Sequence, residues 1–165
     1  MGFQKHTKKD DEHERYFQIN KNGGFKMLLK EEQIVNYLKD QNIFDPSGEN
    51  QTVFGITMPS TLDYLLFGAA SVLSTKYNVV NLSDKGIAIL AIDNLTGKIV
   101  EGEHAFIPKE QINKLEVKSK FTHHRLTIET PEGNTGFKLN KIMIGANWHK
   151  KNLPNVLQAV ETKKL

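Results

Sequence analysis

From residue 77 onward, short runs rich in apolar residues alternate with turn signals, a pattern that predicts a succession of β-strands. A similar run precedes them at 51–57. The turns between the runs carry Ser, Asp, Asn, Gly or Pro, which chain reversals favour. The predicted strands are 51–57, 77–82, 86–93, 98–107, 112–120, 122–130 and 135–140.

The last three strands predict an antiparallel meander with one apolar and one polar face. Pairing Thr130 with Thr135 aligns the final two strands, and a shift of one residue would reverse both faces. Such a sheet packs one side on a core and leaves the other in water. The apolar face comprises Leu115, Val117, Leu126, Ile128, Phe137 and Leu139. The polar face comprises Lys114, Glu116, Lys118, His123, Arg125, Thr127 and Lys138.

Two segments have helical periodicity. Residues 30–40 predict a short amphipathic helix, closed by the turn cluster at 45–50. Residues 148–162 predict a second helix with an apolar stripe, in which Asn152 caps the start and Pro154 lies in the first turn.

Length and composition indicate one globular domain with an extension. The chain has 165 residues, of which 38% are hydrophobic and 25% charged, and the absence of cysteine excludes disulfides, thiolate metal sites and a thiol nucleophile. We expect a mobile charged arm over 1–29, which includes a potential short hairpin, then a helix and turn over 30–49 and a folded domain over 50–165. The chain lacks the apolar stretch of a secretory signal or a membrane span, so we expect a cytoplasmic protein.

The order of elements resembles a known family. Seven short strands and a closing helix, with the segments KYNVVNLSDKGIAILAID, IPKEQINKLEVKSK, HRLTIETPEGNTGFKL and WHKKNLPNVLQAVE, resemble bacterial pleckstrin-homology-like (PH-like) domains of unassigned function. The resemblance covers about residues 50–162. It implies an α+β, mostly β roll of about seven antiparallel strands in two nearly orthogonal sheets, plugged by the C-terminal helix. It implies no activity, and phosphoinositide binding is disfavoured because the loop between the first two strands holds a hydrophobic run instead of several Lys and Arg.

Charge is distributed unevenly along the chain. Residues 98–165 carry 12 Lys and Arg against 7 Asp and Glu, whereas residues 1–97 are slightly acidic. A basic half attracts phosphate, anionic lipid or an acidic protein surface. Nucleic acid is disfavoured because only two arginines occur and no aromatic platform is interleaved. The candidate binding residues on the polar sheet face are Lys114, Lys118, His123, Arg125 and Lys138.

One pairing expected within this face reduces its charge. A hairpin that pairs Ser119 with Thr122 brings Glu116 opposite Arg125, where the carboxylate would cancel part of the basic array. A solvated sheet face without a ligand is the simpler interpretation of the same residues.

A second candidate surface is the apolar segment 62–73. Its residues Tyr64, Leu66 and Phe67 either pack into the core, as a short buried helix, or form a patch for a partner or a second copy of the chain.

The sequence contains no catalytic motif, and we expect neither an enzyme nor a metal or other cofactor. His123 and His124 are adjacent on a predicted strand, so their side chains leave opposite faces and cannot chelate one ion together. Glu101 and Glu103 share a strand face at i and i+2, a spacing that would suit an acid/base pair but is also common on solvent-facing strands.

These observations favour a non-catalytic interaction module that binds a macromolecule, with a protein as the expected partner. The contact would be a sheet edge, the apolar patch or the basic sheet face. The alternatives are peripheral attachment to an anionic membrane through the basic half and, less favoured, a small enzyme with an unrecognised site.

Overall fold

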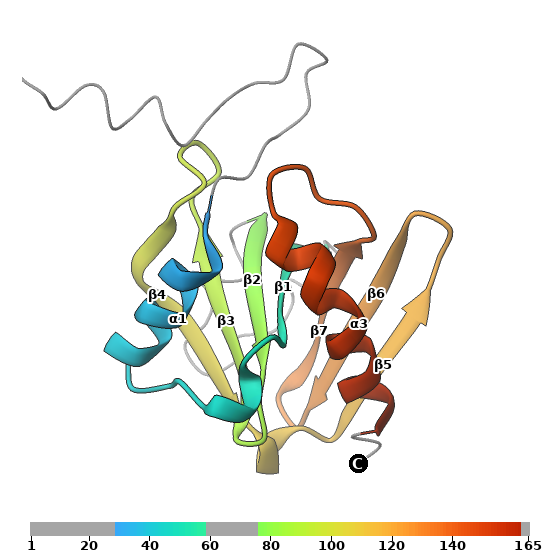
Figure 1. Ribbon diagram of the computed structural model, residues 1–165. Coiled ribbons are helices and arrows are strands. Elements are labelled where there is room, and N and C mark those ends of the chain that lie inside the picture. The colour runs from blue at the N-terminus through green and yellow to red at the C-terminus, as the bar shows by residue number, and fades with distance from the viewer. Residues whose placement is uncertain (1–28, 59–75, 163–165) are drawn as a thin grey trace, which may run out of the picture.

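The computed structural model describes residues 29–58 and 76–162 and has the α+β, mostly β fold that the sequence predicts (Figure 1). A short helix, α1 (Glu31–Asp40), precedes seven strands, and a long helix, α3 (Asn147–Thr162), closes the chain. Two 3₁₀ turns, Pro46–Gly48 and Lys109–Gln111, lie in connections. The strands are β1 (Thr52–Thr57), β2 (Tyr77–Leu82), β3 (Gly86–Ile92), β4 (Ile99–Pro108), β5 (Lys114–Ser119), β6 (His123–Thr130) and β7 (Gly133–Asn140).

The strands form one antiparallel sheet in the order β4-β3-β2-β1-β7-β6-β5. β1 joins β7 only near its end, where Ile56 faces Lys138 and Thr57 faces Phe137. This short junction divides the sheet into a four-stranded half, β1–β4, and a three-stranded half, β5–β7. The division is consistent with the two sheets of a PH-like roll.

Two apolar layers explain why the halves differ. An inner layer lies between the two halves and α3, and it includes Val80, Ile89, Leu126 and Val156. An outer layer covers the other face of β1–β4, where Ile34 of α1 packs with side chains of β1, β2 and β3. β3 is therefore buried along its whole length, whereas β6 alternates buried and partly exposed residues.

The start of α3 is anchored by two side chains. Trp148 donates its indole N–H to the carbonyl of Leu29 at 2.7 Å. His149 is fully buried and accepts the Phe54 N–H at Nδ1 (2.9 Å), so its proton lies on Nε2, which donates to the Asn140 carbonyl at 2.7 Å. One imidazole thus joins β1, the end of β7 and α3.

The predicted capping role of Asn152 is wrong. Its buried amide donates to Glu31 Oε1 of α1 at 2.6 Å, and the helix has already begun at Asn147. Pro154 therefore lies inside the helix instead of in its first turn. A proline there removes one backbone hydrogen bond, and the Trp148 and His149 contacts hold the turn that precedes it.

The meander has the predicted faces but a different register. The Lys120 N–H donates to the His123 carbonyl at 2.8 Å, so these two residues pair and the β5–β6 turn contains only Phe121 and Thr122. In the β6–β7 hairpin, Thr130 faces Gly133. Both pairings are shifted by two residues from the expected ones. The six residues predicted for the apolar face all lie in or against the inner core.

Candidate binding site on the open sheet face

The outer face of β5–β7 carries polar side chains that are exposed or half-buried. Its residues come from the polar positions of three alternating strands, so the pleat directs them away from the inner core. The strands hold these side chains at fixed cross-strand spacings. This face is the candidate binding site.

Three cations lie side by side across this face. Lys118 of β5 is directly opposite Arg125 of β6, which is directly opposite Lys138 of β7. We call these three residues the basic row. Like charges directly opposite each other destabilise a sheet. Among the described residues, no carboxylate lies within ion-pair distance of Arg125 or Lys138.

The carboxylates of the face lie toward its other end. Glu116 pairs with Lys118 at 3.1 Å and with Lys114 at 3.6 Å, and Glu129 pairs with Lys114 at 3.8 Å. The pKa of Glu116 is lowered, chiefly by the hydrogen bond from Lys118 and further by the charge of Lys114. Lys114, a predicted site residue, lies between two carboxylates and does not extend the basic row. Lys118 shares Glu116 with it, so Arg125 and Lys138 are the members of the row without an ion pair among the described residues.

The expected opposition of Glu116 and Arg125 is wrong. The two-residue shift places Glu116 opposite Thr127 and Lys118 opposite Arg125. The carboxylate that would have screened Arg125 is instead held along its own strand. The actual register concentrates positive charge that the expected register would have dispersed.

The two adjacent histidines leave opposite faces, as predicted. His123 is half-buried on the outer face, two residues before Arg125 of the basic row and opposite Asn140. His124 is buried on the inner side, with Nδ1 2.9 Å from the Ser119 hydroxyl. Burial chiefly lowers the pKa of His124, and the charges of nearby Lys141 and His123 lower it further. His124 is therefore a structural, neutral residue, and only His123 belongs to the outer face.

The carboxylates of β4 do not form the regular pair that the sequence suggested. The pairing of β3 with β4 is irregular over this stretch, and Gly102, between Glu101 and Glu103, has a φ of 76°. This bulge interrupts the alternation on which the shared face depended. Tyr37 of α1 accepts the Gly102 N–H at 3.1 Å and lies 3.1 Å from His104 Nδ1, so the bulge anchors α1.

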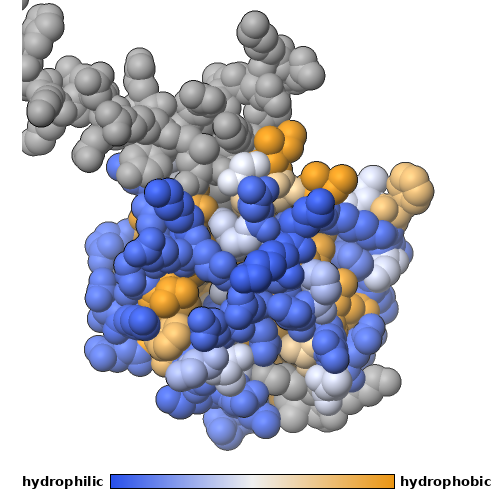
Figure 2. Space-filling view, viewed as in Figure 1, coloured by the Kyte–Doolittle hydropathy of each residue, from blue (hydrophilic) through white to orange (hydrophobic). Residues whose placement is uncertain are grey.

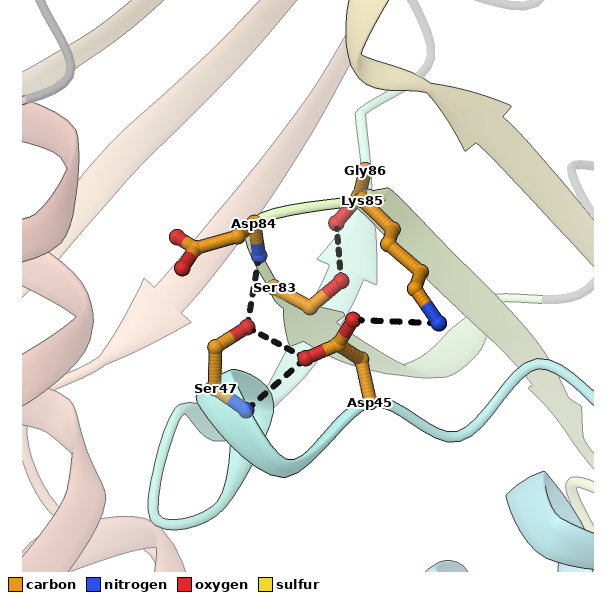
Figure 3. Close-up of polar contacts among 6 residues, drawn as sticks. All are labelled: Asp45, Ser47, Ser83, Asp84, Lys85 and Gly86. Atoms are coloured by element: carbon orange, nitrogen blue, oxygen red, sulfur yellow. Dashed lines mark hydrogen bonds and ion pairs between the residues drawn. The ribbon is translucent and has the colours of Figure 1, made fainter.

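A second polar cluster fixes the connection before β1 to the β2–β3 turn (Figure 3). Asp45 accepts the Ser47 N–H and hydroxyl at 2.9 and 2.6 Å, and lies 3.5 Å from the Lys85 ammonium. The Ser47 oxygen accepts the Asp84 N–H at 2.8 Å. The hydrogen bonds from Ser47 are the main cause that lowers the pKa of Asp45. The polar groups of this cluster bond to one another, which supports a structural role for the turn.

Two lysines next to the basic row were missing from the predicted site. Lys120 directly follows β5, and Lys141 directly follows β7, where its N–H donates to the Thr122 carbonyl at 3.1 Å. The sequence showed both as charged residues at strand ends, but only the register brings the two loops together. The predicted patch residues Tyr64, Leu66 and Phe67 lie outside the described residues.

No protein-family model, curated protein or solved structure matches this chain. Across residues 29–58 and 76–162, no three His, Cys, Asp or Glu side chains are grouped so that they could hold a metal ion. Within the same residues, no helix has the length and apolar character of a membrane span.

Proposed function

We propose that this chain is a non-catalytic binding module that holds a negatively charged macromolecular surface against the basic row. The observation that carries the proposal is the register of Lys118, Arg125 and Lys138, which places three cations side by side without a described carboxylate at the second and third. This arrangement lowers stability. A ligand that supplies the missing negative charge would relieve the repulsion.

The geometry suits a ligand with several regularly spaced anionic groups. Neighbouring strands lie about 4.8 Å apart, so the basic row extends about 10 Å across three strands. Carboxylates of an acidic protein segment and phosphates of a lipid surface both offer such groups. Arg125 adds a planar fork that binds either anion with two hydrogen bonds.

A variant that removes the basic row tests this proposal. K118Q/R125Q/K138Q should bind poly-glutamate or phosphatidylserine vesicles about 100-fold more weakly than the unmodified chain, because each cation at an anionic surface contributes about 1 kcal/mol. The matched control is K39Q/K109Q/K150Q, which loses the same charge from exposed positions elsewhere. Equal weakening in the two variants would show a net-charge effect and would refute a site.

The two probes separate the sources of negative charge. Binding to poly-glutamate alone indicates an acidic protein partner, the class expected from the sequence. Binding to vesicles alone indicates a membrane. Failure to bind either probe at low salt would contradict the proposed function.

A further inference from the structure

We infer that one end of the roll docks on an anionic membrane and inserts apolar loop tips into it. The topology identifies this end. Because β5 and β7 run in the same direction on either side of β6, the β5–β6 turn and the β7–α3 loop leave the sheet at the same end (Figure 1). We call these two connections the loop end.

The exposed apolar residues of the described chain are concentrated at the loop end. Leu95, Phe121, Ile142 and Ile144 are the large hydrophobic residues with exposed side chains, and their exposed fractions are 81%, 96%, 77% and 51%. Single exposed hydrophobic residues are normal on a protein surface. Three of these four lie in the two connections of the loop end, a grouping that indicates a contact.

Three of them form one group. Phe121 lies in the β5–β6 turn, which the Lys141 N–H ties to the β7–α3 loop through the Thr122 carbonyl. Ile142 and Ile144 lie in that loop. Figure 2 shows hydrophobic side chains along the upper edge of the molecule, above these two connections. We call Phe121, Ile142 and Ile144 the apolar tip.

Cations flank the apolar tip, whereas the fourth residue has an acidic neighbour. Lys120 and Lys141 are the chain neighbours of Phe121 and Ile142, and the basic row lies on the adjoining face. Leu95 lies two residues after Asp93, whose carboxylate accepts the Leu95 N–H at 3.0 Å. The loop end, formed by β5, β6 and β7, is therefore the part that an anionic surface attracts.

A lipid surface fits this combination better than a protein does. Apolar side chains that protrude from loops insert into the interfacial region of a bilayer, while long lysines beside them reach the headgroups. A second copy that docked with the same tip would oppose Lys120 and Lys141 to their own counterparts. Anionic lipid neutralises these cations, and each neutralised cation increases the affinity about fivefold.

Vesicle binding by tip variants tests the inference, which rests on the proposed function for its electrostatic part. F121S and I142S should each lower affinity for phosphatidylserine-containing vesicles about tenfold or more through lost apolar insertion. L95S, at an equally exposed position beside Asp93, should change it less than twofold. All three should retain the thermal midpoint of the unmodified chain, because the side chains replaced are exposed.

A direct probe of insertion accompanies the variants. In F121W, the added tryptophan should be quenched by brominated acyl chains when the vesicles contain phosphatidylserine and should remain unquenched with phosphatidylcholine alone. Trp148 is buried and provides the constant background.

The outcomes distinguish this inference from the proposed function. If vesicle binding requires the basic row but not Phe121 or Ile142, insertion is refuted and the proposed function stands. If poly-glutamate binds and vesicles do not, the membrane is the wrong partner. Equal loss of poly-glutamate binding in F121S, or binding of an RNA oligonucleotide that depends on Phe121, would also overturn the inference.

Discussion

The two halves of the sheet differ in how many of their faces are buried. Along most of β1–β3 both faces are covered, the inner by the core and α3, the outer by α1 and Trp148, whereas β4 at the edge is buried only in part. In β5–β7 the inner face is covered and the outer face presents polar side chains to solvent. In a sheet that is packed on both faces, few residues can be replaced without loss of packing. The open face is therefore where charge can be arranged for binding.

The largest expected effect compares matched positions on the two outer faces. Leu90→Ala removes a fully buried side chain from the layer under α1, and should lower the free energy of unfolding by about 2–5 kcal/mol. Thr127→Ala on the outer face of β6 should change it by less than about 0.5 kcal/mol. Urea unfolding measures both. Similar losses at the two positions would contradict the difference between the halves.

The second expected effect concerns the junction of the halves. Burial is the main cause that lowers the pKa of His149, so the native state keeps this imidazole neutral while the unfolded chain titrates near its ordinary value of about 6.5. Below that pH the unfolded chain binds the extra proton. Stability is then full above about pH 6.5 and falls as the pH decreases, by at most about 1.4 kcal/mol per pH unit for this group.

Urea unfolding between neutral and mildly acidic pH checks this dependence. His124 contributes in the same direction because its pKa is also lowered. His149→Gln, which cannot titrate, should flatten the pH dependence more than His124→Gln, because His149 is bonded at both nitrogens. An unchanged slope in His149→Gln would show that His149 does not change its protonation on unfolding.

The smallest expected effect is a gain in stability. Arg125→Thr removes the centre of the basic row and should raise the free energy of unfolding by about 0.2–1 kcal/mol at low salt, because it relieves like-charge repulsion. The gain should shrink as salt screens the charges. Lys109→Thr, in the 3₁₀ turn before β5, is the control and should show no gain. A loss of stability in Arg125→Thr would mean that the basic row stabilises the fold.

The sequence predicted the elements and the two faces of the meander because hydrophobic periodicity determines both. It did not predict the register. A shift of one residue would reverse the faces, but a shift of two preserves them. The register is therefore determined by the position of the turns and not by the hydrophobic pattern. The expected pairing of Ser119 with Thr122 also enclosed two residues, but the turn in the structure lies one residue later, at Phe121–Thr122, and this position brings Lys118 opposite Arg125.

Other features depend on contacts between distant segments. Nothing local indicates that His149 bonds Phe54 or that Asn152 bonds Glu31, so the helix start was predicted from capping residues alone. The predicted basic face contained the whole basic row, because those cations alternate with core residues. The apolar tip was not predicted, because a turn sequence does not show which loops share an end of the roll.

Mapping the contact surface residue by residue would test the central difference between the halves most directly. Amide NMR spectra recorded while poly-glutamate or phosphatidylserine nanodiscs are added should change at the outer face of β5–β7, centred on Lys118, Arg125 and Lys138. Amides of α1 and of β1–β4 should remain unchanged. Changes centred on α1 and the four-stranded half, with the basic row unaffected, would contradict the account.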